Sequence, residues 1–295
     1  MTRRPSQRAD RCRPNGAGRW TTGLARLSAL AATFVLLVAA GGDDGIDTAA
    51  VDTSNITGGI AAPPSGTVET LPAAPNPVRP GEYLKFSVQY GPIHAGSAYL
   101  EVPKVEEIQG HKALMLQARA ESNGFFSTFY KVRNKIQSYW DEEGRFSLRY
   151  VENRREGGYK AQNDISFDYD KLDAIYKDGK TYAIPPHVQD ALSAFYYTRT
   201  QALPLGGSIV FDYHASRKSL PLEVKVLGRE KIETPAGKFN CVAVEPILKA
   251  GGIFKKKGRL VIWLTDDDRR MPVLMKSKVT VGSISVVLQE YRTGA

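Results

Sequence analysis

Two adjacent arginines are the residues best suited to hold an anionic ligand. They are Arg154 and Arg155, within the segment Glu-Asn-Arg-Arg-Glu-Gly-Gly at 152–158. A guanidinium can donate two parallel hydrogen bonds to a carboxylate or a phosphate, so this pair could bind a ligand of that kind. The alternative is a hairpin whose arginines pair with the neighbouring glutamates.

A second basic cluster comprises Lys255, Lys256 and Lys257, which follow the apolar Phe254. Cations beside apolar side chains suit the surface of an anionic membrane, where each contributes about 1 kcal/mol. We therefore take the three lysines, together with the two arginines, as candidate ligand-binding residues. An ordinary exposed loop is the alternative for the lysines.

The sequence shows no arrangement of side chains typical of an enzyme or a metal site. No histidine lies in a His-Glu-x-x-His motif or at zinc-binding spacing from a cysteine, so each is expected on the surface or in a turn. The four histidines are His94, His111, His187 and His214. A Gly-x-Ser-x-Gly motif and a phosphate-binding glycine loop are also lacking. We therefore predict neither catalysis nor a cofactor or metal.

Two groups of carboxylates were weighed as reactive or metal-binding groups. Asp168 and Asp170 are two residues apart, which places both on one face of a strand, as paired acid and base groups would need. A solvated outer face is the simpler interpretation. The run Asp266–Asp268 lacks the alternation and the glycine of a calcium loop and is followed by two arginines, which predicts a charged hairpin turn.

The N-terminal segment resembles a secretory signal peptide. An arginine-rich stretch precedes fourteen uncharged residues at 27–40, which are too few for a bilayer span of about 20 residues. We predict a signal peptide at 1–40, cleaved near Ala40, and export to the periplasm, with an uncleaved membrane anchor as the alternative. Gly42 stands where a lipoprotein would carry its acylated cysteine, so no lipid anchor is predicted. Residues 41–80, rich in Pro, Ala and Gly, are expected to be a disordered tether.

The net charge indicates which binding partners to expect, and the cysteine content indicates whether a disulfide can form. The net charge of +9 favours anionic surfaces, but the charges are scattered and no nucleic-acid-binding motif accompanies them, so nucleic acid is not expected as a partner. Once Cys12 is removed with the signal peptide, Cys241 has no partner for a disulfide. It lies in an apolar run and is expected to be a buried thiol.

Alternation of apolar and polar residues predicts a single curved β-sheet domain at 81–295. Leu84, Phe86, Val88 and Tyr90 alternate with polar residues, and similar runs recur between Gly-containing turns. We expect a mainly β fold, a strongly curved antiparallel sheet or half-closed barrel of about ten or eleven strands. One helix is expected after Asp190, over 191–201, and a shorter one over 125–131, with their aromatic side chains in the core. Whether the barrel is hollow stays open.

Several segments, in this order, resemble a bacterial family known as domain of unknown function 3108. They are Gly81–Val88, Ala95-Gly96, Phe129–Val132, Glu152–Gly158, Ile165–Asp168, Gln189–Arg199, Glu233–Cys241 and Ile262–Val273. The resemblance implies an exported, mostly periplasmic protein without assigned chemistry. Its pattern is similar to that of the curved-sheet carriers that move lipoproteins through the periplasm.

Two functions remain open from the sequence. The first is a periplasmic carrier or chaperone whose concave apolar face binds an acyl chain, while the candidate basic residues hold an acidic headgroup. The second is a protein interaction module in envelope assembly, which would use a sheet edge or the helix at 190–201. A hydrolase is not favoured because no nucleophile and base are recognisable.

Overall fold

The computed structural model describes residues 76–248, 259–278 and 282–294. The predicted signal peptide, most of the predicted tether and the three lysines at 255–257 lie outside the described residues. Val78, at the end of the predicted tether, is buried in the core, so the packed domain starts a few residues before Gly81.

The described residues form fifteen strands and two helices. The strands are β1 (Tyr83–Tyr90), β2 (Ile93–Glu101), β3 (Val105–Ile108), β4 (His111–Ser122), β5 (Val132–Asp141), β6 (Ser147–Glu156), β7 (Tyr159–Asp168), β8 (Asp173–Tyr176), β9 (Thr181–Ala183), β10 (Ser208–Ala215), β11 (Lys218–Thr234), β12 (Gly237–Leu248), β13 (Leu260–Thr265), β14 (Pro272–Lys278) and β15 (Ser283–Arg292). The helices are α2 (Gly124–Phe129) and α3 (Ala191–Arg199).

All strands belong to one antiparallel sheet that curls but does not close, in the order β10-β11-β12-β13-β14-β15-β1-β2-β4-β5-β6-β7-β8-β9, with β3 paired to β4. The first strand therefore pairs with the last. The prediction of a mainly β, strongly curved sheet is confirmed, whereas the expected count of ten or eleven strands is too low. Short strands such as β3, β8 and β9 contain too few residues to show an alternating pattern.

The predicted turns fall between the strands. Gly91 follows β1, Gly110 follows β3, Gly157 and Gly158 join β6 to β7, and Gly179 joins β8 to β9. Several of these glycines have positive φ, which other residues adopt only at a steric cost. Local turn chemistry therefore determines where the sheet reverses.

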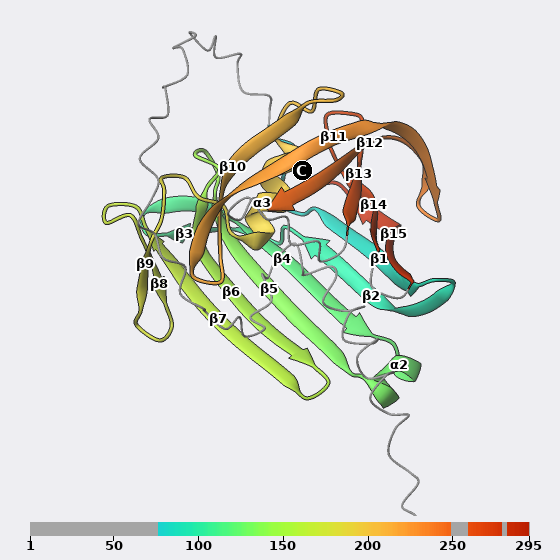
Figure 1. The fold of residues 1–295 in the computed structure, drawn as a ribbon, viewed down its shortest axis with the longest axis horizontal. Helices are drawn as coiled ribbons and strands as arrows, with labels where there is room; N and C mark the ends of the chain where they lie inside the picture. Colours follow the sequence, from blue (N-terminus) through green and yellow to red (C-terminus); the bar gives the residue numbers. More distant parts are fainter. Residues whose placement is uncertain (1–75, 249–258, 279–281, 295) are drawn as a thin grey trace, which may run out of the picture.

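Helix α3 lies inside the curve of the sheet (Figure 1). Asp190 caps it as predicted, because its Oδ1 accepts hydrogen bonds from the backbone N–H groups of Leu192 and Ser193 at 2.8 and 2.9 Å. Seven of its nine residues are buried, since strands cover it on several sides. The helix therefore offers little surface to a partner protein, and its use as an interaction surface stays a prediction.

Helix α2 lies at the far end of the β4–β5 hairpin, away from α3 (Figure 1). It contains no buried residue, and Phe125 and Phe129 are 68% and 74% exposed. The prediction that its aromatic side chains belong to the core is wrong, because the helix projects past the strands that would cover it.

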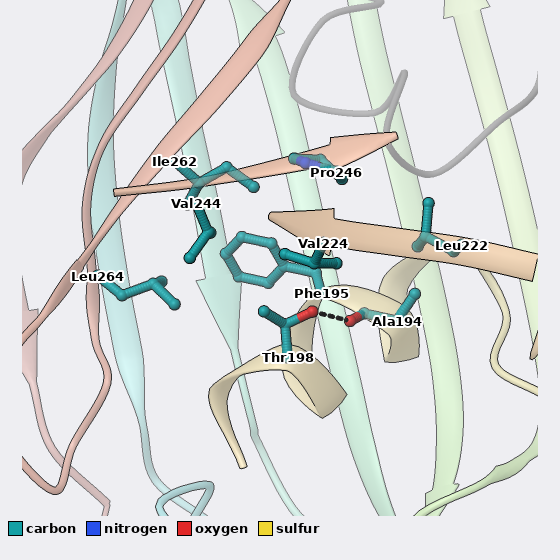
Figure 2. Close-up of a pocket in the computed structure, with 9 residues that line it drawn as sticks. All are labelled: Ala194, Phe195, Thr198, Leu222, Val224, Val244, Pro246, Ile262 and Leu264. Atoms are coloured by element: carbon teal, nitrogen blue, oxygen red, sulfur yellow. Dashed lines mark hydrogen bonds between the residues drawn. The ribbon is translucent and has the colours of Figure 1, made fainter. Parts of the chain in front are cut away.

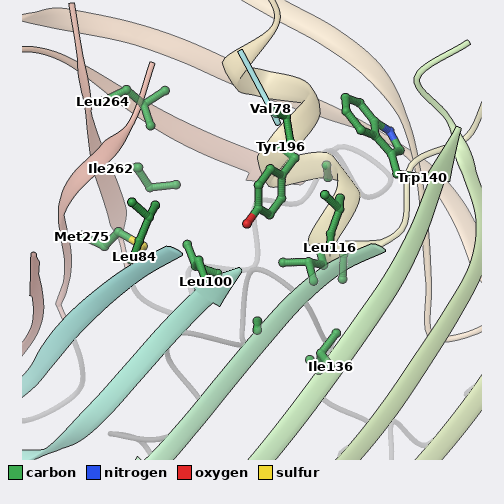
Figure 3. Packing of buried hydrophobic residues seen from close by; sticks show 14 of the residues in the cluster. Val78, Leu84, Leu100, Leu116, Ile136, Trp140, Tyr196, Ile262, Leu264 and Met275 are labelled. Atoms are coloured by element: carbon green, nitrogen blue, oxygen red, sulfur yellow. The ribbon is translucent and has the colours of Figure 1, made fainter. Parts of the chain in front are cut away.

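Most of the core is one large apolar cluster that joins the two halves of the chain, and a small second cluster comprises Ala113, Phe146 and Leu148. Figure 3 shows Tyr196 of α3 among apolar side chains from both halves, including Leu84, Leu116 and Leu264. Large buried side chains such as Trp140 fill this space.

Cys241 is a buried free thiol, as predicted. In the described part of the chain, neither helix could cross a bilayer by length and apolarity.

Candidate functional site

The two ends of the curled sheet meet at a contact that we call the seam. Here the β10–β11 hairpin lies against the residues that precede α3. The Gln189 N–H donates to the Asp212 carbonyl at 2.9 Å, and the His214 N–H donates to the Gln189 carbonyl at 2.8 Å. These bonds form an isolated parallel β-bridge between Gln189, which belongs to no strand, and Tyr213 of β10. The seam therefore brings together residues from distant parts of the sequence.

His214 lies at the centre of the seam. Its Nε2 is 2.9 Å from Tyr176 Oη, and its Nδ1 is 2.9 Å from Ser219 Oγ. Only 1% of the residue is exposed, so the prediction that it lies on the surface or in a turn is wrong. Burial lowers the pKa of His214 to about 4, which keeps the ring neutral near pH 7.

The turn that closes the β10–β11 hairpin has a strained backbone. Ser216 and Arg217 have φ of 48° and 64°, in the left-handed region that favours glycine. The Arg217 guanidinium donates to Tyr182 Oη and to Asp178 Oδ2, both at 2.8 Å. Its backbone N–H donates to Tyr176 Oη at 2.9 Å. These contacts hold the strained turn in place, as at many binding sites.

A polar cavity of about 230 Å³ lies beside the seam, and we call it the seam cavity. It is bounded by the inner faces of β6 and β7, by β8, by the start of α3 and by the strained turn. Its lining residues are Tyr150, Glu152, Arg154, Tyr159, Ala161, Gln162, Asn163, Ile165, Tyr176, Asp190, Ala191, His214, Ala215, Ser216 and Arg217. A cavity with such a lining suits a small polar ligand.

The inner face of β6 supplies a buried row of charges, Glu152, Arg154 and Glu156. Arg154 Nε donates to Glu156 Oε1 at 3.1 Å, and Arg154 Nη1 lies 3.5 Å from Glu152 Oε1. Asn134 Nδ2 also donates to Glu156 Oε1, at 2.7 Å. Two carboxylates thus surround one guanidinium, so Arg154 has little charge left for an acidic ligand.

Glu152 is the least satisfied member of this row. Its Oε2 accepts a hydrogen bond from Asn163 Nδ2 at 2.7 Å, whereas its buried Oε1 has only the 3.5 Å ion-pair contact with Arg154 and accepts no hydrogen bond from the described residues. Burial raises the pKa of this carboxyl group above its ordinary value. A buried acceptor without a donor costs free energy, so a ligand that donates a hydrogen bond here would be stabilised.

The structure directs the two predicted ligand-binding arginines to opposite faces of the sheet. Arg154 points into the seam cavity, whereas its neighbour Arg155 is exposed on the outer face of β6 because successive residues of a strand alternate in direction. Lys255, Lys256 and Lys257 lie outside the described residues. The alternative for the arginines is confirmed for Arg154, which pairs with the neighbouring glutamates.

Three of the carboxylates weighed as reactive or metal-binding groups take part in local ion pairs. Asp168 ends β7 and pairs with Lys171 at 2.8 Å. Asp266 pairs with Arg229 and Arg270, and Asp267 pairs with Arg269, in the connection between β13 and β14. The prediction of a charged hairpin turn is confirmed.

A second, apolar cavity lies between α3 and strands β11–β13, and we call it the apolar slot. Figure 2 shows Phe195 of α3 pointing between Val244 and Leu264. Its lining residues are Ala194, Phe195, Thr198, Leu222, Val224, Val244, Pro246, Ile262 and Leu264. The slot encloses only about 10 Å³, roughly the space for one water molecule.

Comparisons with known proteins identify a family and a similar fold, but they indicate no chemical activity. The model of a family described as "Protein of unknown function (DUF3108)" matches residues 85–289. No curated protein sequence matches the chain.

One of the similar solved structures shares the architecture. A β-barrel-like protein of the domain of unknown function DUF1849 from Brucella abortus is 8% identical, with a TM-score of 0.50 over 74% of this chain and 99% of that chain. A "putative lipoprotein" from Parabacteroides distasonis is 11% identical, with a TM-score of 0.33 over 72% of this chain and 95% of that one. At such identities the first likeness shows a β-barrel-like fold alone.

Proposed function

This chain belongs to the DUF3108 family, whose members share no assigned activity, and we propose from its own site that it is an exported binding protein of the cell envelope that holds a small polar ligand in the seam cavity. The observation that carries the proposal is Glu152 Oε1 at the wall of that cavity, a buried acceptor that makes a 3.5 Å ion-pair contact with Arg154 but accepts no hydrogen bond from the described residues. Export is part of the proposal and rests on the pattern of residues 1–40.

The charges around the seam cavity favour a ligand with an amine or another strong hydrogen-bond donor. Two carboxylates, Glu152 and Asp190, line the cavity. Of the two lining arginines, Arg154 is already paired with Glu152 and Glu156, and the Arg217 side chain is paired with Asp178. An acidic headgroup, the ligand we expected for Arg154, would meet two carboxylates instead. A cationic donor would pair with the ionised form of Glu152 and complete its hydrogen bonding.

The test is the binding of small amines to the full chain. We would titrate ethanolamine and putrescine by calorimetry into the wild type, into Glu152→Gln, and into the control Glu233→Gln, which changes an exposed carboxylate. Loss of the charge at Glu152 should weaken binding roughly tenfold or more, and the control should bind like the wild type. Because the ionised carboxylate binds the cation, affinity should also fall as the pH drops through the raised pKa of Glu152.

Native mass spectrometry of the protein purified from cells would give an independent readout. A small co-purified molecule that is lost from Glu152→Gln supports the proposal. Equal binding by all three proteins, or no bound species with any of them, would contradict it. The proposal is of binding without catalysis, so turnover of generic esterase or glycosidase substrates would also count against it.

Carriage of an acyl chain is a second candidate, supported by the apolar lining of the slot beside α3. At about 10 Å³ the slot would have to widen by movement of α3 away from β11–β13. A lipid in the native mass spectra that is retained by Glu152→Gln would favour this candidate over the first.

A further inference from the structure

Helix α2 carries a knob of three phenylalanines, of which Phe125 and Phe129 are exposed and Phe126 is half-buried. The ring centroids of Phe125 and Phe126 are 5.6 Å apart, and those of Phe125 and Phe129 are 5.5 Å apart. The Phe125 ring therefore contacts both of the other rings, although no residue of the helix is buried. Large apolar side chains that gather on the surface mark an interaction site more often than scattered ones do.

Other exposed apolar side chains lie at the same end of the molecule. Ile93, 51% exposed, begins β2 next to α2, where Asn123 Nδ2 donates to the His94 carbonyl at 2.6 Å. Tyr159, 47% exposed, follows the β6–β7 turn, whose Gly157 N–H donates to the Lys131 carbonyl just after α2. The knob is therefore the centre of a wider apolar end.

A row of cations runs across the outer face of the sheet beside the knob. Arg133 on β5 is opposite Arg155 on β6, and Arg155 is opposite Lys160 on β7. Lys131 precedes this row and is also exposed. None of the four forms an ion pair with another described residue, although Glu121 is opposite Arg133 on β4. Like charges placed opposite one another repel, so an anionic partner would relieve an unfavourable arrangement.

We propose that this end of the molecule, which we call the basic rim, docks on an anionic lipid bilayer. The rim comprises Phe125, Phe126 and Phe129 of α2, with Lys131, Arg133, Arg155 and Lys160 beside them. The phenylalanines enter the boundary between headgroups and acyl chains, and the cations contact the headgroups. A projecting apolar knob flanked by cations suits a fluid anionic surface, whereas a protein partner would need a matching pocket.

Vesicle co-sedimentation of the full chain tests the proposal. Wild-type protein should bind vesicles that contain about 30% phosphatidylglycerol and bind pure phosphatidylcholine much less, with the difference reduced by salt. F125S/F129S should weaken binding roughly tenfold or more, because two apolar anchors are lost. R133Q/R155Q/K160Q should remove the preference for anionic vesicles.

Matched control variants replace apolar and basic side chains elsewhere on the surface. L205S/V210S replaces two other apolar side chains that are 53% and 55% exposed. K177Q/K180Q/K218Q removes three exposed charges at the β8–β9 and β10–β11 turns. Both should bind like the wild type. The apolar segment at 27–40 is present in every protein, so differences between variants report on the basic rim.

A local readout avoids any dependence on overall folding or on other membrane contacts. Tryptophan at position 129, introduced as Phe129→Trp, should be quenched by vesicles of brominated anionic lipid, and Val210→Trp should show no added quenching. Equal binding by all variants, or equal quenching at both positions, would overturn the proposal. Self-association in the absence of vesicles that F125S/F129S abolishes would overturn it as well and would assign the rim to a second copy of the chain.

Discussion

At the scale of single residues, a buried ion pair holds helix α3 to the sheet. Arg199 Nη1 and Nη2 donate to the two carboxylate oxygens of Glu82 at 2.8 and 2.6 Å. The same guanidinium donates to the carbonyls of Arg270 and Arg269, at 3.0 and 3.2 Å. One side chain thus joins the end of α3, the start of β1 and the β13–β14 turn.

Arg199→Met should lower the free energy of unfolding by about 3–5 kcal/mol, because it leaves the Glu82 carboxylate buried without a counter-charge. Urea unfolding followed by circular dichroism measures the loss. Adding Glu82→Gln should recover part of it. Arg229→Met, which breaks an exposed pair with Asp266, should cost less than about 1 kcal/mol. Equal losses for the two arginine variants would refute the assigned role of Arg199.

His214 should make the protein less stable as the pH falls from about 6.5 to about 4. Its folded-state pKa is about 4, below that of an unfolded histidine, so only the unfolded chain takes up the proton in this range. The loss should be on the order of 2–3 kcal/mol. Urea unfolding at a series of pH values should show a smaller loss for His214→Gln.

The difference between the wild type and His214→Gln gives the contribution of His214 to the pH dependence of stability. Burial raises the pKa values of Glu152 and Asp190, which act in the opposite direction, but both proteins share these groups. His94→Gln, which replaces an exposed histidine, should follow the wild type. Parallel curves for wild type and His214→Gln would show that burial of the ring does not control the pH dependence.

At the scale of elements, β2 and β4 approach each other closely at Gly96. A Cβ atom at this position would lie 2.1 Å from the carbonyl oxygen of Glu121. That neighbour is backbone and cannot rotate away. The close approach is next to the bond from the Asn123 N–H to the Ala95 carbonyl, which positions the start of α2.

Gly96→Ala should therefore destabilise the protein by about 2–3 kcal/mol, since the two strands must separate to admit a methyl group. Gly158→Ala is the matched control, because a Cβ there would meet nothing within 4 Å. Its effect should be close to zero. Thermal unfolding of the two variants in parallel should give a lower midpoint temperature for Gly96→Ala than for Gly158→Ala. Similar midpoints would contradict the predicted clash.

Local sequence patterns predict well which turns, strands and helices form. They predict poorly which of these elements other parts of the chain cover. The glycine turns and the cap at Asp190 depend only on neighbouring residues, and both are confirmed. The opposite directions of Arg154 and Arg155 also follow from alternation along β6, since Tyr150 on the same strand already marks the inner face. The exposure of α2 does not follow from its own residues, because it depends on where the covering strands end.

At the scale of the whole molecule, the curl of the sheet creates the candidate site. The seam cavity joins β6, β8, α3 and the β10–β11 turn, which are far apart in the sequence. Glu152 begins the segment at 152–158, whereas His214 belongs to no recognised motif, so only the three-dimensional arrangement indicates that they share a cavity. The curved, mainly antiparallel architecture was predictable, because it follows from alternation and turns alone.

The pairing of β1 with β15 has a consequence for the newly made chain. On one side β1 joins β2, but its other row of backbone N–H and C=O groups stays bare until residues 283–292 have been synthesised. Bare strand edges recruit other chains, so the nascent polypeptide is exposed to aggregation throughout its translation. A ribosome that stalls near the 3′ end of the message would therefore release a nearly complete polypeptide in which β1 and β14 each lack the partner strand β15. Such an aggregation-prone polypeptide is a substrate for cellular quality control.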